Sequence, residues 1–295
     1  MQSAFVQFQE NLKARDMKMI LITRFAIELE SSSKFFETKE GVEWFNHRLS
    51  FFKKTCLPSI LNQLTRPDLW VIFITKNKNI HTKLSNETLG FDFIKIVEIE
   101  KFTAFKEIVS AFLLKDNLSQ SITTRLDCDD ALFPEYFKTV KSISDKTSSD
   151  CLFEPSKGLS LQVEDETITR AAYIQKLLPP FLSFINRTGD NIHVFSFNHD
   201  EWPKVFITEK QNKTPLWIQV VHENNISNQF GWGWMVKSVV EINPGEIQHL
   251  FTTLDVVNKS SIKLIKVNFR HCLYLIQEKF YKRTRNRKSL KIGKD

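Results

Sequence analysis

The stretch Ser121–Ala131, SITTRLDCDDA, decides the fold and places a site on it. Its first six residues form a short run of strand length with β-branched members, which indicates a buried strand. Three acids, Asp127, Asp129 and Asp130, follow directly. Acids so close together repel one another unless a cation lies among them, and Mg²⁺ or Mn²⁺ prefers such oxygen ligands. We therefore predict a ligand site at the end of this strand. The alternative is a solvated acidic turn that caps the next helix.

Strand-like and helix-like segments alternate on both sides of this stretch. The runs Met17–Ile27, Leu69–Thr75 and Phe91–Ile99 are apolar and of strand length, whereas Phe45–Leu64 and Phe102–Leu118 repeat apolar residues at helical spacing. Such alternation predicts an α/β fold with a mostly parallel sheet flanked by helices. In an open sheet of this kind, ligands bind beyond the carboxyl ends of the strands, where the acidic stretch is expected.

The second half of the chain is richer in β-structure. Short strands are predicted at Cys151–Pro155, Lys157–Val163, Glu166–Ala172 and Trp217–His222, the second and third as a hairpin. The segment Ser260–Tyr281 then repeats apolar residues at the spacing of an amphipathic helix. We predict one domain over residues 1–255, followed by this helix and a basic tail over 256–295.

Charge is concentrated at the C-terminus. Residues 279–295 hold eight Lys or Arg and one acid, a balance of +7 that equals the net charge of the whole chain, so residues 1–278 are neutral. A neutral body argues against a nucleic-acid partner. The four cysteines form no CxxC pair, which argues against a zinc site and favours free thiols in the cytoplasm. The apolar runs are too short to span a membrane.

The acidic stretch alone leaves three functions open, because phosphatases, polymerases and sugar-transfer enzymes all use Asp-x-Asp. The first is a metal-dependent glycosyltransferase. The second is a metal-dependent phosphoryl hydrolase that uses Asp127–Asp130. The third is a non-catalytic sugar- or membrane-binding protein with a decayed site, which the presence of all three acids disfavours.

Four motifs in sequence separate these alternatives. They are Ile22–Phe25 (ITRF), Trp44–Gln63 with its Arg48, Leu49, Phe52 and CLPS, Thr124–Ala131 (TRLDCDDA), and Trp217–Asn228 (WIQVVH…NISN). In this order they resemble the bacterial "putative rhamnosyltransferase" family, relatives of the GT-A-fold glycosyltransferases. The resemblance covers about residues 17–230. It implies a GT-A-like domain whose nucleotide-sugar half spans about 17–150 and whose acceptor half spans about 151–255.

The resemblance also implies roles for single residues. Asp129 would ligate the divalent cation, Mn²⁺ or Mg²⁺, and Asp127 would lie beside the ribose or reach the metal through water. His222, at the end of a predicted strand, would complete the metal sphere; the alternative is a histidine hydrogen-bonded within a loop. Thr23 and Arg24 belong to the motif at the end of the first strand and would bind the donor.

The arginines next to the predicted strand ends have two interpretations each. Arg24 and Arg125 could each clamp the phosphates of the donor or pair with the acidic cluster, and for Arg125 that pairing could be purely structural, as a counter-charge to the acids. Arg48 and Lys53 are expected to be solvated.

The segment His199–Pro203 is the best local candidate for a catalytic base, but a surface turn explains it as well, so no catalytic residue is assigned.

The basic tail gives the last prediction. An anionic membrane surface attracts Lys and Arg residues by about 1 kcal/mol each. We therefore expect residues 279–295 to hold a cytoplasmic enzyme at the inner face of the membrane, where it would transfer sugar from a nucleotide-sugar donor to a glycan or lipid-linked glycan acceptor.

Overall fold

The structure is a computed structural model, and it describes residues 17–28, 34–100, 102–198, 201–211, 213–223, 225, 230, 236–251 and 254–256. The predicted amphipathic helix at 260–281 and the basic tail at 279–295 lie outside the described residues, as do His199, Asp200 and the loop 226–228. Among the described residues, no helix is long and apolar enough to cross a bilayer.

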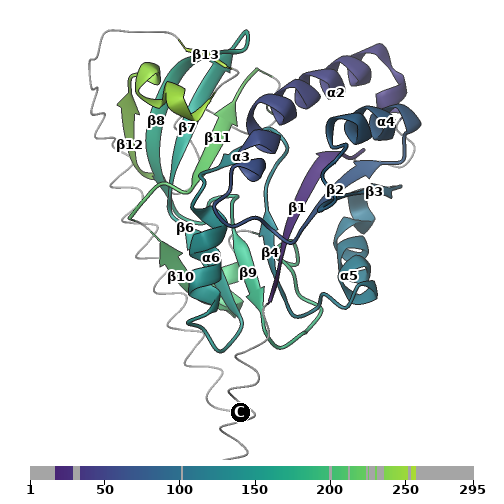
Figure 1. Cartoon of the computed structure of the whole chain (residues 1–295), viewed down its shortest axis with the longest axis vertical. Coiled ribbons are helices and arrows are strands. Elements are labelled where there is room, and N and C mark those ends of the chain that lie inside the picture. Colours follow the sequence, from purple (N-terminus) through teal and green to yellow (C-terminus); the bar gives the residue numbers. More distant parts are fainter. Residues whose placement is uncertain are drawn as a thin grey trace, which may run out of the picture.

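The first sheet has seven strands in the order β10-β6-β9-β4-β1-β2-β3 (Figure 1). Strands β4, β1, β2 and β3 run parallel, β9 is antiparallel to both β4 and β6, and β10 is parallel to β6. Their bounds are β1 Lys18–Ala26, β2 Leu69–Thr75, β3 Ile94–Ile99, β4 Ser121–Arg125, β6 Cys151–Pro155, β9 Ser183–Asn186 and β10 Ile207–Gln211. The predicted mostly parallel sheet with flanking helices is confirmed.

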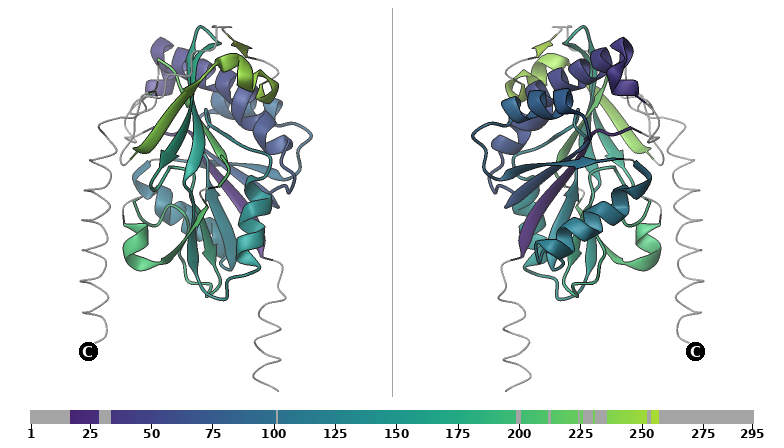
Figure 2. Two further views of the ribbon diagram at one scale, coloured as in Figure 1. Left: turned by 90° about the vertical axis from the view of Figure 1, so that its left-hand side faces the viewer. Right: turned by 90° about the vertical axis from the view of Figure 1, so that its right-hand side faces the viewer.

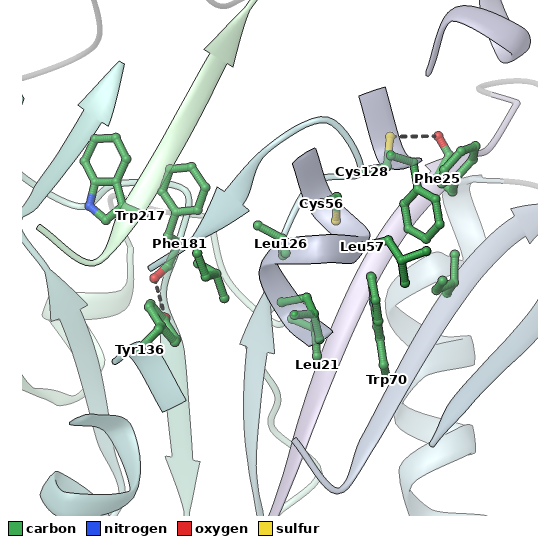
Figure 3. Close-up of a cluster of buried hydrophobic side chains, with 14 of the residues drawn as sticks. Leu21, Phe25, Cys56, Leu57, Trp70, Leu126, Cys128, Tyr136, Phe181 and Trp217 are labelled. Atoms are coloured by element: carbon green, nitrogen blue, oxygen red, sulfur yellow. Dashed lines mark hydrogen bonds between the residues drawn. The ribbon is translucent and has the colours of Figure 1, made fainter. Parts of the chain in front are cut away.

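Both faces of this sheet are covered, which is why β2 is apolar from Leu69 to Ile74 and β1 from Met19 to Ile22. Along β1, Leu21 joins a core cluster with Phe52, whereas Ile20 and Ile22 join a second cluster with Phe105 (Figure 3 shows the first). The first cluster lies under η1 Phe35–Glu37, α2 Lys39–Phe51, η2 Phe52–Cys56, α3 Leu57–Leu61, α4 Lys78–Glu87 and α6 Tyr136–Ser144. The second lies under η3 Phe102–Ala104, α5 Phe105–Lys115 and α7 Trp202–Val205.

Helices α2 and α3 follow one another along the chain without a break, joined by the π-helical segment η2. Thr38 caps the start of α2 by accepting a hydrogen bond from the backbone N–H of Gly41. Pro58, expected to kink the helix or to begin a second one, lies in the first turn of α3, directly after the π-helical segment η2. A π-helical turn inserts one extra residue and turns the side chains that follow it, and such turns are frequent at functional sites.

The second sheet has the order β12-β8-β7-β11-β5, with β13 along β8, and lies at the end of the molecule toward which β1 points (Figures 1 and 2). Its strands are β5 Ala131–Leu132, β7 Lys157–Glu164, β8 Thr167–Lys176, β11 Trp217–Val221, β12 Val236–Ile242 and β13 Asp255–Val256, and η4 Pro244–Leu250 packs on it. The β7–β8 hairpin predicted from the sequence is present. Each half of the chain contributes strands to the other half's sheet, since β5 joins the second and β6, β9 and β10 complete the first. The division near residue 150 stays a prediction.

Trp217 connects the two sheets. Its ring stacks on Phe181 at 4.7 Å between centroids (Figure 3). Its Nε1 donates to the carbonyl of Pro155 at 2.6 Å. The backbone of Gly158 on β7 lies against the same ring, where a Cβ atom would come within 2.0–2.3 Å of it. Position 158 therefore has room only for glycine, and that close approach fixes the position of β11.

Candidate active site

The acidic stretch lies at the point where the strand order of the first sheet reverses. Strands β2 and β3 continue on one side of β1, and β4 lies on its other side. Arg24 is near the carboxyl end of β1, and Arg125 is the last residue of β4. The backbone N–H of Leu126 still donates to Ile22 at 3.2 Å, so Asp127 follows immediately beyond the sheet. Open α/β sheets bind their ligands at this position.

We call Arg24, Arg125 and Asp127 the switch-point cluster. Arg24 Nη2 lies 3.4 Å from Asp127 Oδ1, and Arg125 Nη2 lies 3.3 Å from Oδ2. The side chains of Arg24 and Asp127 are 27% and 29% exposed. The Phe195 ring packs against both guanidinium groups, whose Cζ atoms lie 5.4 and 5.3 Å from its centroid. The cluster is therefore partly open to solvent and is supported from one side by an aromatic ring.

The charges of this cluster favour an anion. Burial alone would raise the pKa of Asp127, but the guanidinium groups of Arg125 and Arg24 outweigh it, so the pKa lies well below its usual range. Burial and the neighbouring charge of Arg125 lower the pKa of Arg24. Two positive charges thus face one carboxylate. The surplus positive charge, on groups that bind phosphate oxygens well, suits a phosphate-bearing ligand.

A second, buried cluster forms around Asp129, two residues further along the acidic stretch. We call Arg48, Asp129, His222 and Asn225 the Asp129 cluster. The Oδ2 atom of Asp129 accepts a hydrogen bond from Arg48 Nη1, lies 3.0 Å from His222 Nε2, and accepts another from Asn225 Nδ2 at 3.1 Å. The side chains of Arg48 and Asp129 are 11% and 3% exposed. One carboxylate oxygen is therefore the meeting point of three side chains.

Helix α2 and the π-helical segment supply one side of this cluster. Trp44, Arg48, Phe51 and Thr55 recur at steps of four and three, so they share one helical face. The Arg48 guanidinium lies over the Trp44 ring, 5.0 Å from its centroid. Phe51 stacks on the His222 ring at 4.4 Å. Thr55, in the π-helical segment, donates from Oγ1 toward the backbone carbonyl of Asp129 at 3.1 Å.

Strand β11 supplies the other side. Ile218 pairs with Ala131 on β5, directly after the acidic stretch. The next contact is from the backbone N–H of Val220 to Asp130 Oδ1 at 2.9 Å. Two residues further along, the His222 side chain contacts Asp129. Burial, together with the charges of Asp129 and Asp127, raises the pKa of Asp130 well above its usual range. Asp130 is buried and thus ties β11 to the acidic stretch.

The structure brings the predicted residues together in two groups. Asp129 meets His222, and Asp127 meets Arg24 and Arg125, but the two carboxylates belong to different clusters. Thr23 is fully buried, and its Oγ1 accepts a hydrogen bond from Trp70 Nε1 at 3.0 Å. That hydroxyl therefore packs within the core.

The expectation for Arg48 was wrong. The sequence predicts a solvated arginine, but Arg48 is 9% exposed and pairs with Asp129. The available signal was the spacing of Trp44, Arg48 and Thr55, which places an arginine on an otherwise uncharged helical face. Lys53 is half-exposed and pairs with Glu87 at 2.9 Å, as expected of a surface charge.

The segment His199–Pro203 and the side chain of His47 belong to neither of these two clusters. Glu201 Oε2 accepts a hydrogen bond from the backbone N–H of Asn198 at 2.7 Å, and Trp202 and Pro203 are buried in the short helix α7. Because 199 and 200 lie outside the described residues, both interpretations of the segment His199–Pro203 stay predictions. His47, which the sequence did not single out, lies edge-on to both Phe51 and His222. Burial and the proximity of His222 lower the pKa of His47.

The comparison with known families decides the relationship. Residues 19–233 match the family described as "Putative rhamnosyl transferase". The chain belongs to this family. No match to the chain was found among curated protein sequences.

Solved structures similar to this rhamnosyl transferase family member are distant. The Staphylococcus aureus TarS 1–349 structure in complex with UDP has 11% identity, a TM-score of 0.41, and covers 70% of this chain and 61% of its own. GalNAc-T7, solved with UDP, GalNAc and Mn²⁺, has 10% identity, a TM-score of 0.43, and covers 74% of this chain and 45% of its own. This chain thus spans about three fifths of the TarS chain and less than half of the GalNAc-T7 chain.

The resemblance implies a divalent cation, and the two clusters permit a test of its fit. Asp129 and His222 are suitable ligand types. However, the Asp129 oxygen that His222 approaches is also bound by the guanidinium of Arg48, and both oxygens of Asp127 face arginines. In the described part of the chain, no three side chains of His, Cys, Asp or Glu gather into a metal site. A guanidinium bound to the same oxygen repels a divalent cation. In this arrangement the residues do not fit a metal ion, and the metal-ligand roles of Asp127, Asp129 and His222 stay predictions.

Proposed function

We propose that this protein is a glycosyltransferase that moves a sugar from a nucleotide-sugar donor to a hydroxyl group of a bacterial surface glycan. The observation that carries the proposal is the convergence of Arg24 and Arg125 on Asp127 at the switch point of the first sheet, in a member of a rhamnosyl transferase family. The family description suggests rhamnose as the sugar.

The switch-point cluster would bind the diphosphate of the donor. In the transfer, the bond between the anomeric carbon and the diphosphate oxygen breaks, and its electron pair leaves with the nucleoside diphosphate. The acceptor oxygen bonds to the anomeric carbon and releases its proton to the solvent. Arg24 and Arg125 can stabilise the negative charge that grows on the leaving diphosphate, which is the main electrostatic task of such a site. Asp127 holds both guanidinium groups in position until the diphosphate binds.

A binding experiment tests this role. Nucleoside diphosphates with each common base would be titrated into the full chain by calorimetry, and the best binder would be tested on Arg24→Ala and Arg125→Ala. We expect each variant to lose about tenfold or more in affinity, because a hydrogen bond to a charged group contributes about 1.5–3 kcal/mol.

Arg170→Ala is the matched control, since Arg170 also pairs with an acid, Glu241, but lies on the second sheet. It should bind the nucleotide as the unchanged chain does. Absence of nucleotide binding, or equal binding by Arg24→Ala and Arg125→Ala, would contradict the proposed donor site. The matching nucleotide sugar, incubated with glycan acceptors, then identifies the transferred sugar by mass.

We also propose that the tail at residues 279–295 holds the enzyme at the inner face of the membrane, near lipid-linked glycan acceptors. Its charge of +7 supports this position. Sedimentation with anionic and with neutral vesicles would compare the full chain with a chain that ends at Glu278. Binding only to anionic vesicles, lost on truncation and in high salt, is expected. Equal binding by both chains would refute the role of the tail.

A further inference from the structure

We propose that Arg48 is the resident counter-charge of Asp129 and does there what a divalent cation would otherwise do, so that the acidic stretch binds donor without a metal ion at Asp129. This inference rests on the proposed function for the identity of the donor. Its structural basis is independent of that function, because it concerns how the carboxylate of Asp129 is neutralised.

The first observation is the way Arg48 is held. It lies on the face of α2 that points to the acidic stretch, with Trp44 against its guanidinium at 5.0 Å. Its side chain is nearly nine-tenths buried, and it donates to Asp129 Oδ2. An arginine keeps its positive charge in proteins, and its planar donors match a carboxylate. A buried carboxylate needs such a partner, since an uncompensated charge in the interior is costly.

The second observation is that the other partners of Asp129 contact the same carboxylate oxygen. His222 Nε2 and Asn225 Nδ2 lie 3.0 and 3.1 Å from Oδ2, and Asn225 Nδ2 is also 3.3 Å from His222 Nε2. The backbone N–H of His222 donates to Asn225 Oδ1 at 2.6 Å, which fixes the loop that carries both side chains. A metal ion that used His222 and this oxygen would have to displace Arg48 from it.

The third observation is that the neighbouring acids are engaged elsewhere. Asp127 faces Arg24 and Arg125, and Asp130 accepts from the backbone of Val220. Each of the three acids in the stretch therefore has its own donors. The role left to Asp129 and Arg48 is to position the turn from which Asp127 extends, which makes Arg48 a positioning residue for the donor site.

The experiment measures metal binding directly. The full chain, treated with EDTA and exchanged into metal-free buffer, would be titrated with Mn²⁺ and followed by electron paramagnetic resonance. We expect no stoichiometric binding in the unchanged chain. We expect Arg48→Gln to bind Mn²⁺ at least tenfold more tightly, because the competing charge is gone, and the gain should disappear in Arg48→Gln combined with Asp129→Asn. Arg48→Lys keeps the charge and should resemble the unchanged chain.

Lys53→Gln is the matched control, because it removes one positive charge from the helical segment that directly follows α2. Lys53 is half-exposed and pairs with Glu87. It should leave Mn²⁺ binding unaltered, and circular dichroism verifies that each variant is folded. Should Arg48→Gln fail to fold, the Mn²⁺ titrations of the unchanged chain and of Asp129→Asn still test the inference. Stoichiometric Mn²⁺ binding by the unchanged chain that Asp129→Asn abolishes overturns the inference, and so does an Arg48→Gln protein that folds without gaining affinity.

A second readout separates this inference from the proposed function. The affinity for the best nucleoside diphosphate would be measured with EDTA and with Mn²⁺. We expect the two values to agree within about twofold, and Arg48→Gln to bind the nucleotide more weakly in EDTA. Nucleotide binding that requires Mn²⁺ in the unchanged chain would overturn the inference and leave the proposed function standing. If no nucleotide binds under either condition, the proposed function fails, and the Mn²⁺ titration still tests Arg48.

Discussion

Two carboxylates only two residues apart have the same kind of partner and opposite surroundings. Asp127 pairs with Arg24 and Arg125 at the partly open end of the first sheet, whereas Asp129 pairs with Arg48 in the interior between α2 and β11. An exposed ion pair contributes little stability, because water and ions screen it. A buried pair is costly to break, because the charge left behind has no solvent. The comparison contrasts a partly open pair, which we expect to exchange its partner for a ligand, with a buried pair, which we expect to maintain the fold.

Removal of the buried arginine should give the largest effect. We expect Arg48→Ala to lower the free energy of unfolding by roughly 3–5 kcal/mol, toward the lower end because His222 and Asn225 remain beside Asp129. Urea unfolding at neutral pH measures it. Lys53→Ala, at a half-exposed position, should cost less than about 1 kcal/mol. An Arg48→Ala protein as stable as Lys53→Ala would abolish the distinction between the two clusters.

Acid should weaken the support of the open cluster. His193 lies two residues before Phe195, the ring beneath Arg24 and Arg125. Its Nε2 lies 3.1 Å from the carbonyl of Lys106, and its Nδ1 accepts from the backbone N–H of Phe195. A neutral ring satisfies both contacts, and a proton on Nδ1 would remove the second. Burial lowers the pKa of His193 from 6.5 to about 4.

The sign of the pH effect follows from this shift. Between pH 6.5 and about 4 the unfolded chain binds a proton at His193 and the folded chain does not, so stability falls as the pH falls through this window. The loss should reach up to about 3 kcal/mol near pH 4 and then level off. His193→Gln should flatten the slope of unfolding free energy against pH, and the exposed His249→Gln should not. Equal slopes in all three proteins would contradict the assignment.

Gly158→Ala should disturb the buried cluster through the second sheet. The added methyl group would collide with Trp217, whose strand carries His222 to Asp129 at its far end. Overpacking of this kind costs about 1–3 kcal/mol. Near-ultraviolet circular dichroism of tryptophan should change as well. Ser160→Ala, two residues along the same strand, is the control, since Ser160 Oγ is buried without a hydrogen-bond partner among the described residues. If Gly158→Ala is no worse than Ser160→Ala, Trp217 does not fix β11.

The smallest effect on stability is expected at the open cluster. Arg24→Ala should change the free energy of unfolding by less than about 1 kcal/mol, because the pair with Asp127 is partly exposed and Arg125 remains. Nucleotide affinity should fall nonetheless, which is the reverse of the pattern expected at a purely structural pair. A loss of stability as large as that of Arg48→Ala would show that the switch-point cluster is also structural.

The sequence by itself determined the central strands and the position of the acidic stretch at the end of β4. Leu69–Thr75 is a strand with the predicted bounds, because a strand buried on both faces forms a nearly continuous apolar run. Ser121–Leu126 predicted β4 to within one residue, and the acids after it lie at the carboxyl edge as expected. These features depend on local composition, which the sequence records directly.

Only the tertiary structure decided how the charges pair. Strand β5 has two residues and exists because β11 lies beside it, so no local pattern announces it. Arg48 and Asp129 are 81 residues apart, and their contact depends on how α2 packs against the acidic stretch. Neighbouring residues in a turn direct their side chains differently, so Asp127, Asp129 and Asp130 each acquire different partners. Periodicity shows which face of an element is buried, and the charge that it meets there depends on the packing of distant segments.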